Sequence, residues 1–143
     1  NNVSEDEAKV VIEVRVPAQV DDAAGKTEAS TVLEKEDTIA IYGSNEFAAK
    51  AIINANGGFK ESKLGADKIL AVGFDSGALQ QDAIRKGIFV GSVTQDPVQI
   101  GYQAVKLAVA SAKGETVKDV DTGSKWYDAK NIDSEEIKAL LYE

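Results

Sequence analysis

The sequence predicts an α/β protein with a three-layer αβα arrangement around an open parallel sheet. Residues 69–74 (ILAVGF) are an unbroken apolar run, which is typical of a parallel strand that helices cover on both faces. Runs rich in β-branched and apolar residues also occur at residues 10–16, 38–42 and 88–94, and a segment with helical features follows each run. This β-α alternation predicts a parallel sheet with right-handed crossovers.

The composition limits the classes of function. The chain has 143 residues, 43% of them hydrophobic, which suits one domain with one buried core. No run approaches the roughly 20 apolar residues that span a bilayer. The formal charge of −8 argues against nucleic-acid binding, which depends on clusters of Lys and Arg. Because Cys and His are absent, disulfides, thiol nucleophiles, zinc sites and imidazole catalysis are excluded, and we expect no cofactor and no metal.

The start of the chain is unusual for a natural reading frame. It reads Asn1-Asn2-Val3, the chain contains no Met, and the basic and apolar regions of a signal peptide are missing. We therefore expect a mature or excised fragment of a longer protein. Cysteine-free chains occur on both sides of a membrane, so the composition leaves the compartment open.

Local signals place the ends of the predicted elements. Pro17 ends the first strand because it lacks an N–H donor, and the acidic pair at residues 21–22 opens the first helix at its positive end. Ser44 or Asn45 can cap the second helix, which is expected to end at the Asn-Gly-Gly of residues 56–58. Further helices are expected at residues 77–86, 97–113 and 133–141, and a weak strand at residues 117–120.

Polar residues follow all four predicted strands at their carboxyl ends. Gln19 comes after the first strand, Ser44 and Asn45 after the second, Asp75 after the third and Gln95 after the fourth. Ligands of open α/β sheets bind in the crevice beyond these ends, so the residues are expected to share one rim. The set contains amides and one carboxylate but no cation, which favours neutral polyhydroxylated ligands over phosphate.

Each of these residues also has a purely structural interpretation. An Asn such as Asn45 at a strand-to-helix junction is more often a helix cap than a ligand contact. Asp75 can likewise cap the helix that follows it, and Gln95 can serve only to complete a turn. Their shared edge of one sheet favours the ligand-binding interpretation. The neighbouring aromatics Trp126 and Tyr127 are expected to be packing residues.

Four segments, in this order and spacing, resemble the sugar-binding proteins of bacterial ABC importers, in particular the ribose- and allose-binding group with the type 1 periplasmic-binding-protein fold. The segments are residues 41–46 (IYGSNE), 71–75 (AVGFD), 93–102 (VTQDPVQIGY) and 121–123 (DTG). The resemblance runs from about residue 10 to the C-terminus. It implies that Asn45, Asp75 and Gln95 hydrogen-bond the hydroxyls of a sugar.

The resemblance also implies an architecture and partners. Family members close two lobes on a monosaccharide, and residues 1–143 match the C-terminal lobe as one unit. The helix at residues 97–113 is then a crossover that belongs to the absent N-terminal lobe, and its apolar face invites dimerisation. The implied partners are a monosaccharide, the N-terminal lobe and the membrane permease of the importer, and not nucleic acid. The implied location is extracytoplasmic, in the periplasm or as a lipoprotein on the surface of a bacterium.

Two features depart from the family pattern. The family lobe normally opens with a further strand and helix, including an arginine contact to the sugar, and neither has a counterpart in this sequence. Val20 occupies a place where relatives can carry an aromatic that stacks on the sugar.

Three functional hypotheses follow. The first is a non-catalytic solute-binding lobe for a monosaccharide. The second is the effector-sensing core of a LacI-type transcriptional repressor of the same fold. The third is a flavodoxin-like or receiver-like domain, which requires bound flavin or a clustered acidic pocket at the strand ends, where the sequence has only Asp75.

Overall fold

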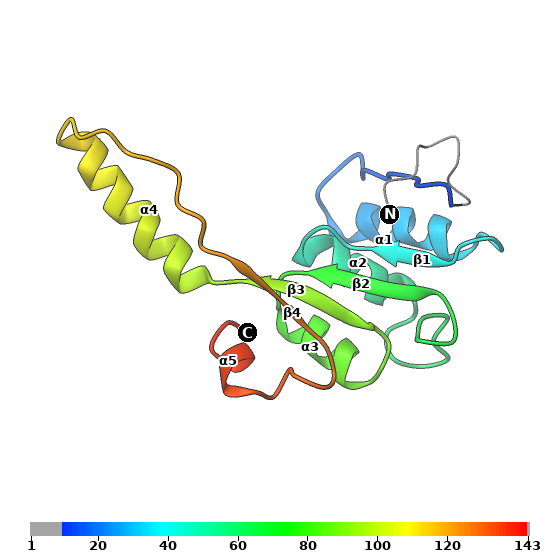
Figure 1. Cartoon of the computed structure of the whole chain (residues 1–143). Coiled ribbons are helices and arrows are strands. Elements are labelled where there is room, and N and C mark those ends of the chain that lie inside the picture. The colour runs from blue at the N-terminus through cyan, green and yellow to red at the C-terminus, as the bar shows by residue number, and fades with distance from the viewer. Residues whose placement is uncertain (1–9, 143) are drawn as a thin grey trace.

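The computed structural model describes residues 10–142, which form a mixed four-stranded sheet and five helices (Figure 1). The helices are α1 (Asp22–Leu33), α2 (Glu46–Ala55), α3 (Ala78–Arg85), α4 (Pro97–Ala112) and α5 (Glu135–Lys138). The strands are β1 (Ala40–Tyr42), β2 (Leu70–Phe74), β3 (Gly91–Gln95) and β4 (Ser124–Tyr127). Their order in the sheet is β1-β2-β3-β4. The predicted α/β class is confirmed, and none of the helices within residues 10–142 meets the length and hydropathy that a membrane span requires.

The helix boundaries follow the local signals of the sequence. Asp21 caps α1 by accepting a hydrogen bond from the main chain of Ala24 at 2.8 Å. Just beyond the C-terminal end of α2, Gly57 and Gly58 adopt φ values of +75° and +73°, which glycine reaches without a Cβ clash. Capping residues and chain-reversing glycines are local features, so the start of α1 and the end of α2 were both predicted within a residue or two.

The core lies between one face of the sheet and two helices. Helix α2 packs against β1 and β2, and α3 packs against β3. Helix α1 packs on α2, where Gly25 leaves room for the ring of Phe47. The largest buried apolar side chains are Tyr127, Phe89, Ile53, Ile84 and Ile132. This core fixes the positions of the first three strands relative to α2 and α3.

The opposite face of the sheet carries exposed apolar side chains. Tyr42 is 57% exposed, Leu70 40% and Trp126 44%. In Figure 1 the sheet lies in front of α2 and α3, and none of the described helices crosses its front face. Of the three layers that the sequence predicts, residues 10–142 therefore form two.

Residues 10–16 were predicted to be the first strand, and this is wrong. The segment pairs with no strand among residues 10–142, and Val11 and Ile12 are 92% and 86% exposed. It runs beside α1, where Arg15 lies 3.6 Å from Glu28 and Lys35 pairs with Glu13. A β-branched run forms a strand only when a neighbouring strand accepts its hydrogen bonds and buries one of its faces, and neither condition holds here.

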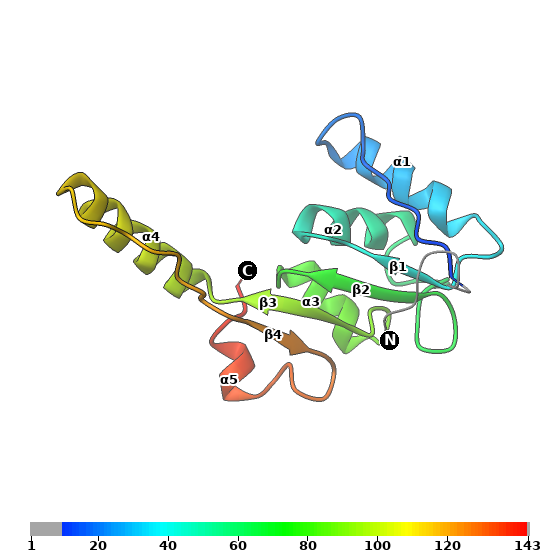
Figure 2. The ribbon, with the colours of Figure 1, turned by 45° about the horizontal axis from the view of Figure 1, so that its top comes forward.

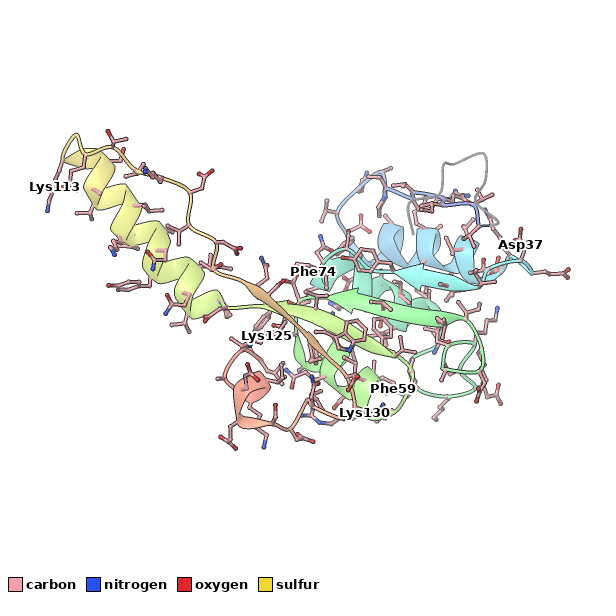
Figure 3. All side chains as sticks on the ribbon, viewed as in Figure 1. Asp37, Phe59, Phe74, Lys113, Lys125 and Lys130 are labelled. Carbon is pink, nitrogen blue, oxygen red and sulfur yellow. The ribbon has the colours of Figure 1, made fainter. Side chains whose placement is uncertain are left out.

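The fully parallel sheet was also wrong, because β4 runs antiparallel to β3. Helix α4 has no buried residue and projects away from the sheet instead of packing back over it (Figures 1 and 2). The chain returns beside α4 and so re-enters the sheet at the edge that it left, which reverses the next strand. The weak strand predicted at residues 117–120 lies on this returning segment and is irregular. Figure 3 shows Lys113 at the far end of α4, remote from Phe74 at the end of β2.

Candidate functional site

The carboxyl ends of β1, β2 and β3 share one edge of the sheet. Strand β2 pairs in parallel with both neighbours, and the pairing continues to the strand ends, where Asp75 donates its main-chain N–H to Val93 at 2.7 Å. Neighbouring strands lie about 4.8 Å apart. Asn45, Asp75 and Gln95 therefore occupy one short rim, together with exposed Ser44.

Asn45 caps a helix, which was one of the two interpretations that the sequence allowed for it. Its Oδ1 accepts a hydrogen bond from the main chain of Ala48 at 2.8 Å and so caps α2. Capping uses only the carbonyl half of the amide. The Nδ2 group has no hydrogen-bond partner among the residues that the structure describes, and Asn45 is exposed. The cap is therefore compatible with a donor that faces a ligand.

Asp75 does not cap the helix that follows it. The N-cap residue of α3 is Gly77, which provides no side-chain cap. The Asp75 carboxylate instead accepts a hydrogen bond from the main-chain N–H of Glu46, at 3.0 Å through Oδ2. This contact joins the end of β2 to the first turn of α2, so Asp75 and Asn45 are brought together. Oδ1 of Asp75 has no partner within residues 10–142.

The main chain of Asp75 has an uncommon conformation. Its φ is +76°, and its carbonyl oxygen accepts hydrogen bonds from the hydroxyl of Tyr127 (2.8 Å), Oγ of Ser92 (3.0 Å) and Nε2 of Gln80 (3.3 Å). All three donors are buried. Burial raises the pKa of the Tyr127 hydroxyl to about 12, so this donor keeps its proton at neutral pH.

Gln95 ends β3 beside Ser124 of β4. The turn that follows is completed by Asp96, whose side chain accepts the capping hydrogen bond of Gln99 at 2.8 Å. The Gln95 amide makes no side-chain hydrogen bond to the described part of the chain. A cavity of about 110 Å³ is lined by Gln95 together with residues of β4 and with Leu140 of the C-terminal segment.

Gln19 does not follow a strand, which corrects the prediction, because residues 10–16 are not one. It is exposed on the segment that leads into α1. Asp22 in the first turn of α1 pairs with Lys50 of α2 at 3.2 Å, so this segment lies at the end of the molecule that carries the rim. Figure 2 shows the same arrangement.

Sequence reasoning missed the contacts that the C-terminal segment makes at the rim. The hydroxyl of Tyr142 donates to Oε2 of Glu46 at 3.3 Å, and the main-chain oxygen of Leu140 accepts from Ser76 and Thr94, both at 3.3 Å. Tyr142 and Glu46 are 96 positions apart, so no local pattern could have joined them.

Within the described residues, no cluster of acidic side chains could hold a metal ion.

Comparisons with known proteins show the family to which this fold belongs. A family model described as a periplasmic binding protein domain matches residues 3–116. An ABC transporter, LacI family transcriptional regulator from Brachyspira murdochii is 44% identical, with a TM-score of 0.76 over 89% of this chain and 42% of its own. An ABC transporter solute binding protein from Agrobacterium vitis with bound D-fucose is 27% identical, with a TM-score of 0.80 over 96% of this chain and 47% of its own.

A carbohydrate transporter solute binding protein from Agrobacterium radiobacter in complex with D-arabinose is 28% identical, with a TM-score of 0.72 over 85% of this chain and 40% of its own. No curated protein sequence matches the chain. The chain spans less than half the length of these three structures. Because the family model covers most of its residues, the chain belongs to the periplasmic binding protein domain family.

Proposed function

We propose that this chain is the C-terminal lobe of a non-catalytic solute-binding protein that delivers a monosaccharide to a bacterial ABC importer. The observation that carries the proposal is the rim itself. Asn45, Asp75 and Gln95 lie together, and each keeps a polar group without a partner among the described residues. The solute-binding relatives solved with D-fucose and D-arabinose support the same ligand class.

The chemistry of the rim suits hydroxyl groups. Asn45 offers an N–H donor, Asp75 offers a carboxylate acceptor and Gln95 offers both kinds of group. Each sugar hydroxyl donates one hydrogen bond and accepts others, so adjacent hydroxyls can bridge these groups. A charged acceptor makes the strongest of these hydrogen bonds. Lys125 lines the cavity beside Gln95, but it is paired with Glu136, which favours an uncharged sugar over phosphate. Gln19 and Ser44 are further candidate contacts at its border.

The rim is one wall of a site and not a whole one. The cavity of about 110 Å³ beside Gln95 is lined by neither Asn45 nor Asp75, and it is well below the roughly 300–1,000 Å³ of small-molecule pockets. Helix α4 supports a second wall, because Val98, Tyr102 and Val105 on it are 70%, 61% and 67% exposed. An exposed apolar stripe of this length is typical of an interface. We assign it to the N-terminal lobe of the same protein, with the sugar enclosed between the lobes by hinge closure.

The remaining partners follow from this assignment. Lobe closure would present a changed surface to the membrane permease of the importer, and a protein of this kind works outside the cytoplasm, in the periplasm or anchored to the cell surface. In the absence of the N-terminal lobe, residues 97–113 are the surface through which two copies would associate.

Titration calorimetry of the full-length protein against pentoses and hexoses tests the proposal. We expect heat with at least one monosaccharide, and about tenfold weaker binding in Gln95→Ala, since one lost hydrogen bond costs about 1 kcal/mol or somewhat more. Asn54→Ala is the matched control, because Asn54 lies at the other end of α2. The absence of heat with every sugar would contradict the proposal.

A second candidate is the effector-sensing core of a LacI-type repressor. It is favoured by the Brachyspira murdochii relative, whose description names both an ABC transporter and a LacI family regulator. The residues that precede this chain in the full-length protein distinguish the two. An export signal there supports the importer, and a DNA-binding helix pair supports the repressor.

A further inference from the structure

The end of β2 contains a strained residue at the centre of the proposed site. Asp75 has φ of +76°, in the left-handed region that residues with a Cβ seldom occupy. Such conformations persist where the surrounding structure holds them, and they gather at ligand sites. The positive φ turns the chain so that the Asp75 carboxylate reaches the first turn of α2, and not the helix that follows it.

Three buried side chains from three different elements hold this conformation. Tyr127 of β4, Ser92 of β3 and Gln80 of α3 all donate to the carbonyl oxygen of Asp75, at 2.8, 3.0 and 3.3 Å. Gln80 also donates to the carbonyl of Phe74 at 2.9 Å, so it fixes the preceding peptide as well. A carbonyl oxygen has two lone pairs, and three donors on it exceed what satisfaction of the acceptor requires.

The side chain of Gln80 has an energetic cost in this core. Oε1 of Gln80 is buried and has no hydrogen-bond partner within the described part of the chain, and such a group destabilises a fold. An apolar side chain at this position would remove that cost. The hydrogen bonds that the Gln80 side chain does make to main-chain oxygens in this core go from its Nε2 to Phe74 and Asp75, the residues at the end of β2.

We infer that Tyr127, Ser92 and Gln80 are positioning residues that lock the main chain of Asp75 and thereby aim its carboxylate at a sugar hydroxyl. The inference rests on the proposed function. According to this inference, Tyr127, Ser92 and Gln80 do not contact the ligand and act only through Asp75. Loss of a donor would let Asp75 relax, so that its carboxylate would need to be ordered again whenever a sugar binds.

A double-mutant cycle in the full-length protein tests this, with D-arabinose and D-fucose as probes in titration calorimetry. Tyr127→Phe removes only the hydroxyl. We expect it to raise the Kd about tenfold when Asp75 is present and less than about twofold in an Asp75→Ala background, because interacting residues are not additive. An equal change in both backgrounds, or none in either, overturns the inference.

Ser92→Ala is the second variant, and it is expected to weaken binding in the same way. Ser62→Ala is its matched control, since it removes a hydroxyl that bonds to Leu64 in the loop before β2, at the opposite edge of the sheet. A loss of affinity in Ser62→Ala as large as that in Ser92→Ala would show a general effect on stability and overturn the assignment.

The carbonyl and Cα ¹³C chemical shifts of Asp75 in the sugar-free protein provide an independent measurement. They are expected to move in Tyr127→Phe and Ser92→Ala but not in Ser62→Ala. If the wild-type protein binds neither sugar nor any other monosaccharide, the proposed function fails, and moved shifts would still uphold the lock on Asp75. Unmoved shifts overturn the lock whatever the titrations give.

Discussion

Asn45 allows the structural task of a residue to be separated from its proposed contact with a sugar. Its Oδ1 caps α2 through the main chain of Ala48, at 2.8 Å, while its Nδ2 has no partner among residues 10–142. Asn45→Asp keeps an oxygen in the capping position and removes only the N–H donor. Asn45→Ala removes both groups. The two variants should therefore differ in stability and agree in ligand binding.

The magnitudes follow from the contacts. Loss of the cap in Asn45→Ala is expected to lower the free energy of unfolding by about 1 kcal/mol. Asn45→Asp keeps the cap and adds a negative charge at the positive end of α2, worth about 0.3–1 kcal/mol. The carboxylates of Asp75 and Glu46 oppose this gain, so the net change is expected to stay within about 0.5 kcal/mol. Each variant loses one hydrogen bond to sugar, which is roughly tenfold in Kd.

Urea unfolding followed by circular dichroism measures the stability term, and titration calorimetry of the full-length protein measures the affinity. Asn45→Asp should show wild-type stability with about tenfold weaker sugar binding. Wild-type affinity in Asn45→Asp would refute a role for the Nδ2 donor. An unchanged free energy of unfolding in Asn45→Ala would refute the stabilisation that we assign to the cap.

Two further predictions concern Tyr127 and α4. Burial raises the pKa of Tyr127 to about 12, so its proton is held more tightly in the folded chain; its contribution to stability is complete below pH 10 and is lost as the pH rises through 12. The two-unit shift corresponds to about 2–3 kcal/mol, and urea unfolding at pH 8 and pH 12 should show a smaller loss in Tyr127→Phe; equal losses contradict the assignment. The isolated chain should self-associate through α4, and Val105→Lys, at a residue 67% exposed, should shift sedimentation towards the monomer without changing thermal unfolding. A wild-type chain that is monomeric at every concentration would rule out this surface.

The features that the sequence predicts well are those set by neighbouring residues. Asn45 caps α2 and Gly57 ends it because capping oxygens and positive φ act within a few positions. The apolar run at residues 69–74 becomes β2 with its strand neighbours on both sides. The rim followed from these elements, since the carboxyl ends of parallel strands must share an edge.

The features that the sequence did not predict depend on contacts with residues far away along the chain. Residues 10–16 have the composition of a strand, but no neighbouring strand pairs with them, so their pattern alone misled. The orientation of β4 depends on the direction in which α4 projects. The apolar face of α4 predicts an interface but not the direction of the helix. Tyr127 was predicted to be a packing residue, and its hydroxyl bond to Asp75 joins positions 52 residues apart.

Helix capping and ligand binding are often treated as competing explanations for a polar residue at a strand end, and this rim shows why they need not compete. An amide has a carbonyl end and an amine end, and a carboxylate has two oxygens. Asn45 and Asp75 each commit one end to the first turn of α2, at 2.8 and 3.0 Å, and keep the other. The committed end restricts the rotamer, so less conformational entropy is lost when a ligand engages the remaining end. The hydrogen bond that stabilises the helix thus also prepares the binding group, and a variant that severs it is expected to weaken sugar binding even where the ligand-facing atom is kept.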